Sequence, residues 1–453
     1  MMIKEEARQV PVIEDVDICV LGGSMTGVFA ALRAARLGAR VAIVERSAAF
    51  GGCITNSAMC KIDTLFDTTF EKQIIAGLTQ EVLDRLSPIP YAVDTTPRDG
   101  RDKFSMLTLG VHQVNSEELK IELDTMILEA KTIIPYLHTF YAAPHIQDGQ
   151  LKAVLVENKS GRGAICAKYF IDATADGDLC MHLGAPIYYN EGLQPATTTA
   201  KVYRWSDDPD IYRTLLAHPE KYGNIAIGWS TFISGFPEGR MLYLTNVDAD
   251  CAQAMPLTYA EMEGRKQMRG MMDVLRAHYP GGNDMVLLSL SSHIGVRETR
   301  QVKCAYQVTF DDLVYGKRFN DAVVNCSYPP DIHHHDKPGC TFWYQDGTYE
   351  YCVTGKELEI GRWRPEEKDD PTFWQVPYRS MIPQGLDNVI VCGRAIDADK
   401  GAFSATRSVI CTNQTGEAAG VAAYIALSCN GSIQSVDTDV LRSTMAKGGS
   451  IVL

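Results

Sequence analysis

The chain has 453 residues, enough for two or three domains, and 45% of them are hydrophobic, which is ordinary for a protein with a sizeable core. Its formal net charge is −13 and the acidic residues are scattered, which argues against nucleic acid as a partner and against a polybasic membrane patch. No run approaches the ~20 apolar residues of a membrane span, and residues 1–17 lack the apolar stretch of a signal peptide, so we expect a cytoplasmic protein.

A βαβ unit is predicted near the start of the chain. Residues 16–21 form a short apolar run that suits a buried parallel strand, residues 28–37 carry apolar side chains at helical spacing, and residues 41–44 suit a second buried strand. Gly38 stands where the glycine after a helix belongs. A glycine-rich turn joins the first strand to the helix, an arrangement typical of dinucleotide-binding domains.

The glycine-rich turn reads Gly22-Gly23-Ser24-Met25-Thr26-Gly27 and matches G-x-G-x-x-G at its first and third glycines. Ser24 replaces the middle glycine, and its hydroxyl can donate to a phosphate oxygen. The helix that begins near Met25 and Thr26 supplies free N–H groups and a positive dipole end for that phosphate. Glu45 ends the second strand about 20 residues on, where an acid binds ribose hydroxyls. The alternative is a doubly wound domain whose glycines serve packing alone.

The segment after Glu45 continues with Arg46, a glycine pair at Gly51 and Gly52, and then Cys53 and Thr55. In this it resembles the FAD-dependent oxidoreductases of the glutathione-reductase-like two-dinucleotide fold. The resemblance implies FAD as cofactor, with contacts along this segment.

The cysteines need a separate reading. Disulfide reductases of that superfamily carry a C-x4-C pair after the glycine pair, whereas Cys53 and Cys60 are spaced C-x6-C. We therefore expect small thiols near the flavin rather than a redox pair. The 13 cysteines are dispersed and odd in number, which favours reduced thiols and indicates neither zinc nor an iron–sulfur cluster.

The rest of the first segment alternates helices and strands. Residues 77–86 and 116–131 are predicted helices, the second capped by Ser116, and residues 133–143 are a predicted strand followed by a hairpin. Tyr141 is the nearest match to the superfamily's adenine contact. Residues 168–186 resemble its second FAD segment, with matches at Ala173, Asp176 and Asp178, and with Ala175 where the pattern has glycine.

The middle of the chain has no second glycine-rich βαβ unit, so we expect no dedicated NAD domain. Strand-like runs at residues 197–205, 225–233 and 240–247 suggest an antiparallel sheet, and residues 256–279 suggest a long helix with Met262, Met268, Met271, Met272 and Leu275 facing inward. From residue 376 the chain returns to the nucleotide fold, with a strand at 389–392, a turn at Gly393-Arg394 and a helix at 415–427. The resemblance places Gln414, Thr415 and Gly416 beside the flavin.

Together these elements predict an α/β protein, with a Rossmann-like FAD-binding domain on a mixed sheet and an inserted α+β substrate domain. The predicted boundaries are 1–186 for the first part of the FAD domain, 187–375 for the substrate domain, and 376–453 for the C-terminal part of the FAD domain.

Three further stretches resemble the family that bacterial genomes label FAD-dependent oxidoreductase: IGVRETRQ at residues 294–301, YPPDIH at 328–333, and the block at 376–420 that includes Arg407. The candidate catalytic residues are His293, which departs from the family's usual arginine, Arg297, His333 and Arg407. Arg297 suits a carboxylate or a carbonyl, and either histidine suits proton transfer. The alternatives are an Arg297–Glu298 ion pair that braces the fold and a solvated or metal-binding histidine run at residues 333–335.

The function predicted from these residues is hydride transfer between flavin N5 and a small polar or anionic substrate, by oxidation of C–OH or C–N or by reduction of an activated C=C. A flavoprotein with FAD that is not or only transiently redox-active, serving an isomerase, an eliminase or an electron-transfer complex, is the alternative; a nucleotide-binding interaction module is a third. Oxygen, a quinone or a redox protein could exchange electrons with FAD. The sequence leaves open whether the protein forms a homo-oligomer.

Overall fold

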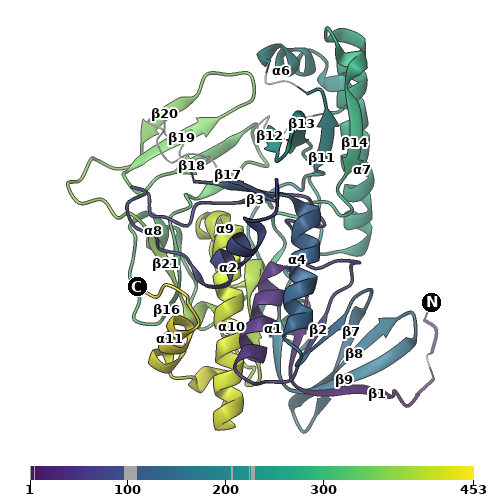
Figure 1. The fold of residues 1–453 in the computed structure, drawn as a ribbon, viewed down its shortest axis with the longest axis vertical. Helices are drawn as coiled ribbons and strands as arrows, with labels where there is room; N and C mark the ends of the chain where they lie inside the picture. The colour runs from purple at the N-terminus through teal and green to yellow at the C-terminus, as the bar shows by residue number, and fades with distance from the viewer. Residues whose placement is uncertain (1, 5, 96–109, 206–207, 224, 226–229) are drawn as a thin grey trace.

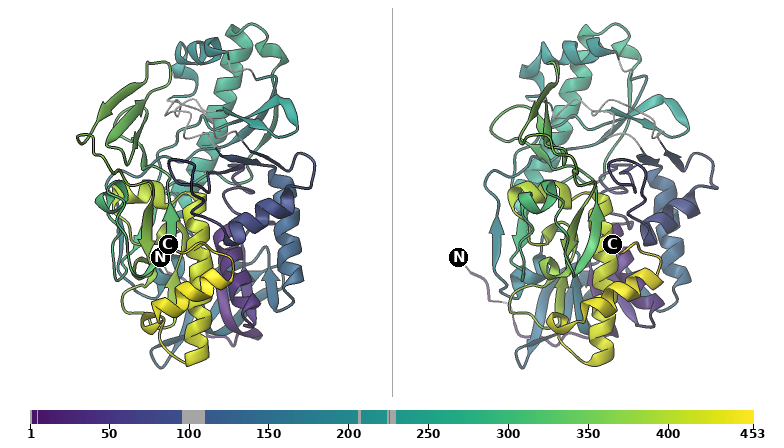
Figure 2. Two further views of the ribbon diagram at one scale, coloured as in Figure 1. Left: turned by 60° about the vertical axis from the view of Figure 1, so that its left-hand side comes forward. Right: turned by 90° about the vertical axis from the view of Figure 1, so that its left-hand side faces the viewer.

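The computed structural model describes residues 2–4, 6–95, 110–205, 208–223, 225 and 230–453. Two lobes are visible in Figure 1, and both views of Figure 2 show the same division. The lower lobe contains the largest sheet and the helices α1 (Met25–Arg36), α4 (Ser116–Glu129) and α10 (Val409–Cys429). The upper lobe contains the long helix α7 (Ala254–His278) and two smaller sheets.

The largest sheet has seven strands and is mixed, as predicted. Its order is β6-β2-β1-β9-β8-β7, with β22 also paired to β9. The pairs of β6, β2, β1, β9 and β22 are parallel, whereas β7, β8 and β9 form an antiparallel meander. The strands are β1 (Val12–Leu21), β2 (Val41–Val44), β6 (Ile133–Tyr136), β7 (Phe140–Gln147), β8 (Gln150–Asn158), β9 (Gly161–Asp172) and β22 (Val389–Val391).

Alternating side chains of β1 serve two different cores. Ile18 and Val20 pack with α1 and α10 on one face of the sheet, while Cys19 and Leu21 pack with the β8–β9 meander on the other. This alternation follows from the two-residue period of a strand. Both faces are covered, which explains why residues 18–21 are apolar throughout rather than alternating in polarity.

Helices α1 and α10 cross at very close range. A Cβ atom on Gly416 would lie 2.1 Å from the backbone oxygen of Thr26, and one on Gly420 would lie 2.2 Å from that of Ala30. Only glycine permits this approach, because any side chain would meet backbone. The start of α1 is therefore positioned by a helix almost 400 residues further along the chain.

The upper lobe has its own core. Strands β11 (Ala200–Tyr203), β12 (Ser230–Ile233), β13 (Phe236–Leu242) and β14 (Val286–Leu290) form the antiparallel sheet β12-β13-β11-β14, with α6 (Pro209–Leu216) and α7 nearby. Met268, Met271 and Met272 of α7 are buried against this sheet, as predicted. Met262 is 63% exposed, so its predicted inward orientation is wrong. A second sheet contains β17 (Asp331–His333), β18 (Cys340–Trp343), β19 (Thr348–Cys352) and β20 (Glu359–Arg362).

The remaining elements connect the lobes or cover the core. They are β3 (Lys61–Ile62), α2 (Gly77–Leu86), β4 (Val93–Thr95), β5 (His112–Val114), α5 (Asp178–His182), β10 (Ile187–Tyr189), β15 (Arg300–Val302), α8 (Phe310–Val314), β16 (Ala322–Cys326), β21 (Trp374–Pro377), α9 (Lys400–Thr406) and α11 (Thr438–Lys447). Strands β16 and β21 pair with each other, and their side chains join the core around α10. The domain boundaries at 187 and 375 stay a prediction.

Several predicted element boundaries differ from the structure. Asn115, not Ser116, caps α4, because the Asn115 side chain accepts from the backbone N–H of Glu117. The strand predicted over residues 133–143 is interrupted between β6 and β7, where His138 has a φ of 49°. Of the strand predicted at 225–233, residues 226–229 lie outside the described part. Among the described residues, no helix is both long enough and apolar enough to cross a membrane.

Candidate active site

A cavity of about 440 Å³ lies between the glycine-rich turn and the upper lobe. Its lining includes residues from the start of α1, the end of β2, the loop after β9, the segment before β15, strand β17 and the start of α10. The sequence-predicted residues that line it are Gly22, Ser24, Thr26, Glu45, Arg46, Gly52, Cys53, Tyr141, Ala173, Asp176, His293, Arg297, His333, Gly393, Arg394 and Arg407. Met25, Gly27, Gly51, Thr55, Gln414, Thr415 and Gly416 do not line it.

The glycines of the first turn permit backbone contacts that no other residue would allow. Gly22 has a φ of 103°, and a Cβ there would lie 2.2 Å from the Ala173 oxygen. A Cβ on Gly27 would lie 1.9 Å from the Gly22 oxygen. Ser24 caps α1 through its backbone, and its hydroxyl makes no hydrogen bond to a described residue. The turn thus presents a free hydroxyl and a helix N-terminus to the cavity.

Glu45 is held in place by two backbone groups. Its Oε2 accepts from Gly23 N at 2.6 Å, and its Oε1 accepts from Ser47 N at 2.7 Å. The carboxylate is 8% exposed and faces the cavity from the end of β2. These two hydrogen bonds fix the orientation of the Glu45 carboxylate, and each of its oxygens can still accept a hydrogen bond from a ligand.

The second glycine pair packs directly on the first turn. Gly51 donates its N–H to the Gly23 oxygen at 2.8 Å, and a Cβ on Gly52 would lie 2.7 Å from Ser24 Cβ. Thr55 is buried beneath this contact and donates its hydroxyl to the Phe50 oxygen at 2.6 Å. Gly51 and Thr55 therefore shape the turn from outside the cavity.

The loop after β9 contains an unusual backbone conformation. Ala175 has a φ of 70°, in the left-handed region where glycine is favoured. This explains physically why the related pattern has glycine at that position. Arg394 fixes the loop by donating to the Ala175 oxygen at 3.0 Å and to Asp176 Oδ1. Asp176 also accepts from the Thr299 hydroxyl at 2.6 Å, so its carboxylate serves the loop.

Helix α10 begins earlier than predicted. Its first residue is Val409 and its cap is Ser408, rather than a start near Thr415. Ser408, Val409 and Thr412 line the cavity, so they occupy the position expected for Gln414, Thr415 and Gly416. Gln414 instead binds both backbone groups of Asn325, at 3.1 and 2.9 Å. The first turns of the helix are rich in β-branched residues of low helix propensity, and these concealed its start although Ser408 is a preferred N-cap residue.

Thr415 and Gly416 serve packing in the second turn of α10. Thr415 Oγ1 accepts from Gly393 N at 2.9 Å, which ties the helix to the loop after β22. Gly416 permits the close approach of α1 described above.

Four side chains form a buried network beside the cavity. Arg407 Nη2 donates to Asp331 Oδ1 at 2.8 Å. The other Asp331 oxygen accepts from the Tyr328 hydroxyl at 3.0 Å and lies 3.7 Å from His333 Nε2. Burial opposes ionisation of Asp331, but the charge of Arg407 and contacts with His333 and Tyr328 hold its pKa below the usual value. Asp331 is therefore an anion that supports two candidate catalytic side chains.

His333 is neutral at physiological pH. Burial and the nearby positive charge of Arg297 lower the pKa of His333 to about 4, against the opposing influence of Asp331. Its neighbours in the histidine run have other partners, since His334 bonds Thr341 at 2.8 Å and His335 lies against Gly192. Of the three, only His333 lines the cavity. Among the described residues, no group of three or more His, Cys, Asp and Glu side chains is placed to hold a metal ion.

Arg297 has no acidic partner among the described residues. Its Nη1 donates to the Pro195 oxygen at 2.6 Å and to Thr197 Oγ1 at 2.5 Å. Burial, followed by repulsion from Arg407, lowers the pKa of Arg297 to about 10. Glu298 faces elsewhere, accepting from Asn190 at 2.9 Å and from the backbone at residue 194 at 3.0 Å. The Arg297–Glu298 ion pair considered from the sequence is therefore not formed.

Two further candidate residues, His293 and Cys53, also line the cavity. His293 is partly exposed, and its backbone N–H donates to the Asn56 oxygen at 3.2 Å. Cys53 is exposed to the cavity. Burial raises the pKa of the Cys53 thiol, while Arg394, Arg407 and Arg297 oppose that rise. Cys60 is a buried free thiol, and no disulfide joins the two.

Sequence reasoning missed several polar residues of the site. Gln194 is buried and accepts from both Arg407 Nη2 at 3.3 Å and His333 N at 3.4 Å. Tyr243, Thr197, Thr199 and Thr231 line the cavity from the upper lobe. These residues lie in the least patterned stretch of the chain, and no local motif could have identified them.

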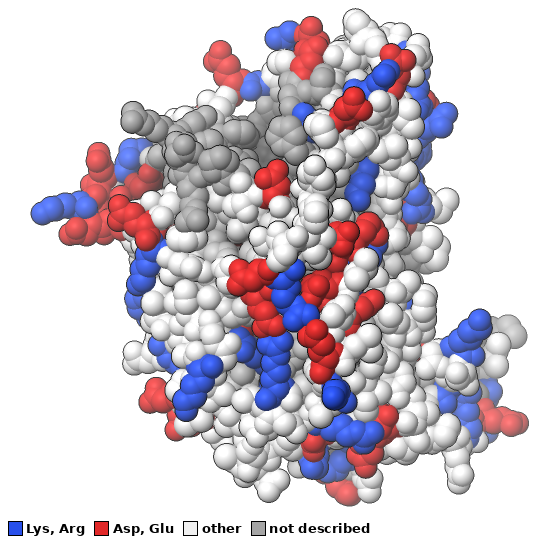
Figure 3. Space-filling model, viewed as in Figure 1, with Lys and Arg blue, Asp and Glu red and all other residues white. Residues whose placement is uncertain are grey.

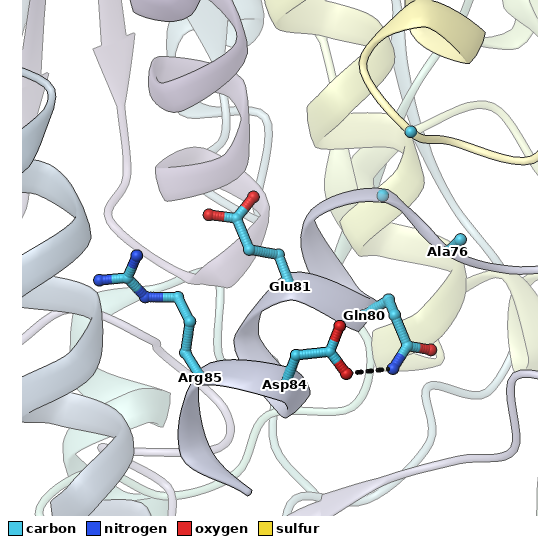
Figure 4. A pocket seen from close by; sticks show the side chains of 7 residues that line it. Ala76, Gln80, Glu81, Asp84 and Arg85 are labelled. Atoms are coloured by element: carbon cyan, nitrogen blue, oxygen red, sulfur yellow. Dashed lines mark hydrogen bonds between the residues drawn. The ribbon is translucent and has the colours of Figure 1, made fainter. Parts of the chain in front are cut away.

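A second, smaller hollow of about 330 Å³ lies on the surface beside α2 (Figure 4). Its charged groups already have partners: Gln80 donates to Asp84 at 2.8 Å, Glu81 binds Arg36, and Arg85 binds two glutamates of α4. Figure 3 shows acidic and basic side chains interleaved on this face of the molecule. Because its charged side chains are already paired, this hollow is a weaker candidate active site than the larger cavity.

Comparison with known proteins now identifies the class. The model of the family described as FAD dependent oxidoreductase matches residues 17–445. The chain therefore belongs to the FAD-dependent oxidoreductase family. A search of curated proteins gives no match. The match confirms the predicted family, the oxidoreductase class of the enzyme and FAD as its cofactor.

Solved structures resemble this chain at low sequence identity. A geranylgeranyl bacteriochlorophyll reductase-like protein from Thermoplasma acidophilum is 10% identical, with 96% of this chain and 82% of that chain covered and a TM-score of 0.47. The p-nitrophenol 4-monooxygenase PnpA from Pseudomonas putida DLL-E4 is 11% identical, with coverages of 96% and 84% and a TM-score of 0.46. The myxobacterial chondrochloren halogenase CndH is 12% identical, with coverages of 95% and 79% and a TM-score of 0.44.

The residues of the cavity fit FAD. Gly22 and Gly27 let the turn pack closely on Ala173 and on itself, and Ser24 offers an unused hydroxyl at the cavity wall beside the N-terminus of α1. The oriented carboxylate of Glu45 suits ribose hydroxyls. The start of the 21-residue helix α10 adds a second positive helix end at the cavity wall.

Proposed function

We propose that this enzyme transfers hydride between flavin N5 and a small polar or anionic organic substrate, oxidising a C–OH or C–N centre or reducing an activated C=C bond. The observation that carries the proposal is the convergence of His333, Arg297 and Arg407 on the cavity that also contains the glycine-rich turn. FAD, when bound, supplies the redox chemistry, and the chain's own residues bind, orient and exchange protons.

The binding roles follow from the geometry of the cofactor half of the cavity. Ser24 and the N-terminus of α1 hold the pyrophosphate, and Glu45 holds the ribose. Arg46 and Tyr141 border the same part of the lining. Gly52, Ala173 and Gly393 provide surfaces without large side chains along which a flat ring system can lie.

The proton-transfer role falls to His333. Its lowered pKa, about 4, leaves the imidazole neutral at physiological pH, so it can accept a proton from a substrate hydroxyl or amine. Asp331, 3.7 Å from Nε2, stabilises the imidazolium that forms. Arg407 is neutralised by Asp331 and orients it, while His293 is a second group able to exchange protons with the cavity.

The test is the visible absorption spectrum of the FAD-loaded protein under anaerobic conditions. We expect one class among hydroxy acids, sugars and amines to bleach the flavin bands, or an activated alkene to restore them in dithionite-reduced protein. The His333→Gln variant should keep its FAD and lose most of the rate. A spectrum that no donor or acceptor changes, with turnover of substrate by isomerisation or elimination, would refute hydride transfer to substrate.

The second half-reaction needs an electron partner. Oxygen, a quinone or a redox protein would serve, and reoxidation rates with each distinguish them. Sedimentation of the loaded protein would establish whether a homo-oligomer forms.

A further inference from the structure

One arginine in the wall of the cavity lacks a salt-bridge partner in the described part of the chain. Three arginines line its catalytic part: Arg297, Arg394 and Arg407. Arg394 pairs with Asp176, and Arg407 pairs with Asp331. Arg297 makes no salt bridge with any described residue and donates only to two neutral oxygens. Of these three arginines, Arg297 is therefore the one without an anionic partner among the described residues.

An unpaired cation in such a place is costly for the folded protein. Removing a guanidinium from bulk water is unfavourable unless an anion or a full set of hydrogen bonds compensates it. The lowered pKa of Arg297, caused by burial and by Arg407, reflects this cost. A cost of this kind is commonly kept at sites where a ligand supplies the missing charge.

The surroundings of Arg297 indicate what kind of ligand fits. The hydroxyls of Thr197, Thr199, Thr231 and Tyr243 line the same cavity and carry no charge. The charge of Asp331 acts on Arg297, but Arg407 already occupies one of the Asp331 oxygens. A carbonyl oxygen would leave the charge uncompensated, whereas a carboxylate compensates it and matches the planar guanidinium with two parallel hydrogen bonds.

We propose that the substrate carries a carboxylate, and that Arg297 binds this group while Arg407 remains paired with Asp331. The proposal rests on the function proposed above and narrows its substrate from polar or anionic molecules to carboxylic acids. Arg297 then contacts substrate through guanidinium nitrogens not used for Pro195 and Thr197.

Carboxylate binding also affects the neighbouring histidine. The positive charge of Arg297 is one reason why the pKa of His333 is low. A bound carboxylate compensates that charge, so His333 becomes a stronger base when substrate is present. The acid limb of the kcat profile should therefore lie at higher pH than that of kcat/KM, which reports the free enzyme.

The experiment is a titration of the oxidised, FAD-loaded protein with acetate and benzoate, and with acetamide and benzamide as uncharged controls of the same shape. Ionic strength is held constant with chloride. We expect the two carboxylates to perturb the flavin spectrum saturably and to raise the melting temperature, while the two amides do neither. The variant Arg297→Gln should bind the carboxylates about 10- to 100-fold more weakly, the loss typical of a charged hydrogen-bonded contact.

Two further variants complete the design. Arg297→Lys keeps the charge and should recover part of the carboxylate affinity. Arg213→Gln is the matched control, because Arg213 is 74% exposed on α6 and, among the described residues, forms its salt bridge with Asp210. It should bind carboxylates like the unaltered protein.

Three outcomes would overturn the proposal: no response to carboxylates, equal affinity in Arg297→Gln, or loss of FAD from Arg297→Gln, which would assign the guanidinium to the cofactor. These outcomes are separable from failure of the proposed function. If a neutral donor reduces the flavin and carboxylates do not bind, only the proposal that the substrate carries a carboxylate is refuted. If carboxylates bind through Arg297 but the flavin never changes redox state, only the proposal of hydride transfer is refuted.

Discussion

Arg407 donates to one oxygen of Asp331 at 2.8 Å, and the other oxygen of that carboxylate faces Tyr328 and His333. One buried anion thus holds the arginine that follows α9 and the histidine that ends β17. Arg407 depends on Asp331 for its charge balance, and the neutral His333 lies 3.7 Å from the same carboxylate.

Replacing Asp331 with Asn should destabilise the protein strongly. The substitution leaves Arg407 buried without its anion, and breaking such pairs costs about 3–5 kcal/mol. Urea unfolding of the apoprotein measures the change. Tyr328→Phe removes one hydrogen bond to the same carboxylate and should cost only about 1 kcal/mol. Equal losses in the two variants would contradict the charge argument.

Acidification should destabilise the protein through His333. Its folded pKa is about 4, below the ordinary value of 6.5, so the unfolded chain binds more protons between these values. Stability from this group is complete above pH 6.5 and falls as the pH drops towards 4. His334 also has a pKa lowered to about 4, by burial and by Lys337, and adds to the trend. His333→Gln should show a shallower decline over this window, and an unchanged slope would count against the assignment.

Glu45→Ala should weaken FAD binding about 10- to 100-fold. The substitution removes the carboxylate that is fixed by Gly23 N and Ser47 N and that we propose to bind the ribose through hydrogen bonds, each worth about 1.5–3 kcal/mol when one partner is charged. Fluorescence titration of the apoprotein with FAD measures the affinity. Glu81→Ala, which removes a surface partner of Arg36, is the control and should bind FAD normally.

Gly416→Ala should lower the stability of the apoprotein by about 1–3 kcal/mol, the usual cost of overpacking. The new Cβ would lie 2.1 Å from the Thr26 oxygen, so α1 and α10 would have to separate. Differential scanning calorimetry without FAD provides the test. An apoprotein of unchanged melting temperature that binds FAD poorly would instead return Gly416 to the role expected from the sequence.

Ala175→Gly should stabilise the protein by about 0.5–1 kcal/mol. The left-handed φ of 70° costs an alanine about 1–2 kcal/mol, which glycine does not incur. Part of this gain is lost because glycine makes the unfolded chain more flexible. Thermal unfolding detects the gain as a higher melting temperature. Ala185→Gly, at a buried alanine that shows no positive φ, should be neutral or destabilising.

The nucleotide-binding part of the fold could be predicted from sequence because its signals are local. The βαβ unit at Gly22, the acid at Glu45 and the glycine pair at Gly51 each lie within a short span, and steric demands fix the glycines. The start of α10 was missed because its first turns are rich in β-branched residues of low helix propensity. The partners of the candidate catalytic residues were equally inaccessible, because Gln194 reaches His333 from 139 residues away.

The close contact between α1 and α10 has a consequence for biosynthesis. Helix α1, which Ser24 caps, is supported by Gly416 and Gly420, which leave the ribosome long after it. The N-terminal βαβ unit therefore lacks its packing surface throughout most of translation, and such distant contacts form slowly. We expect cofactor loading to follow synthesis of the C-terminal helices, so that nascent chains interrupted before residue 409 remain without FAD.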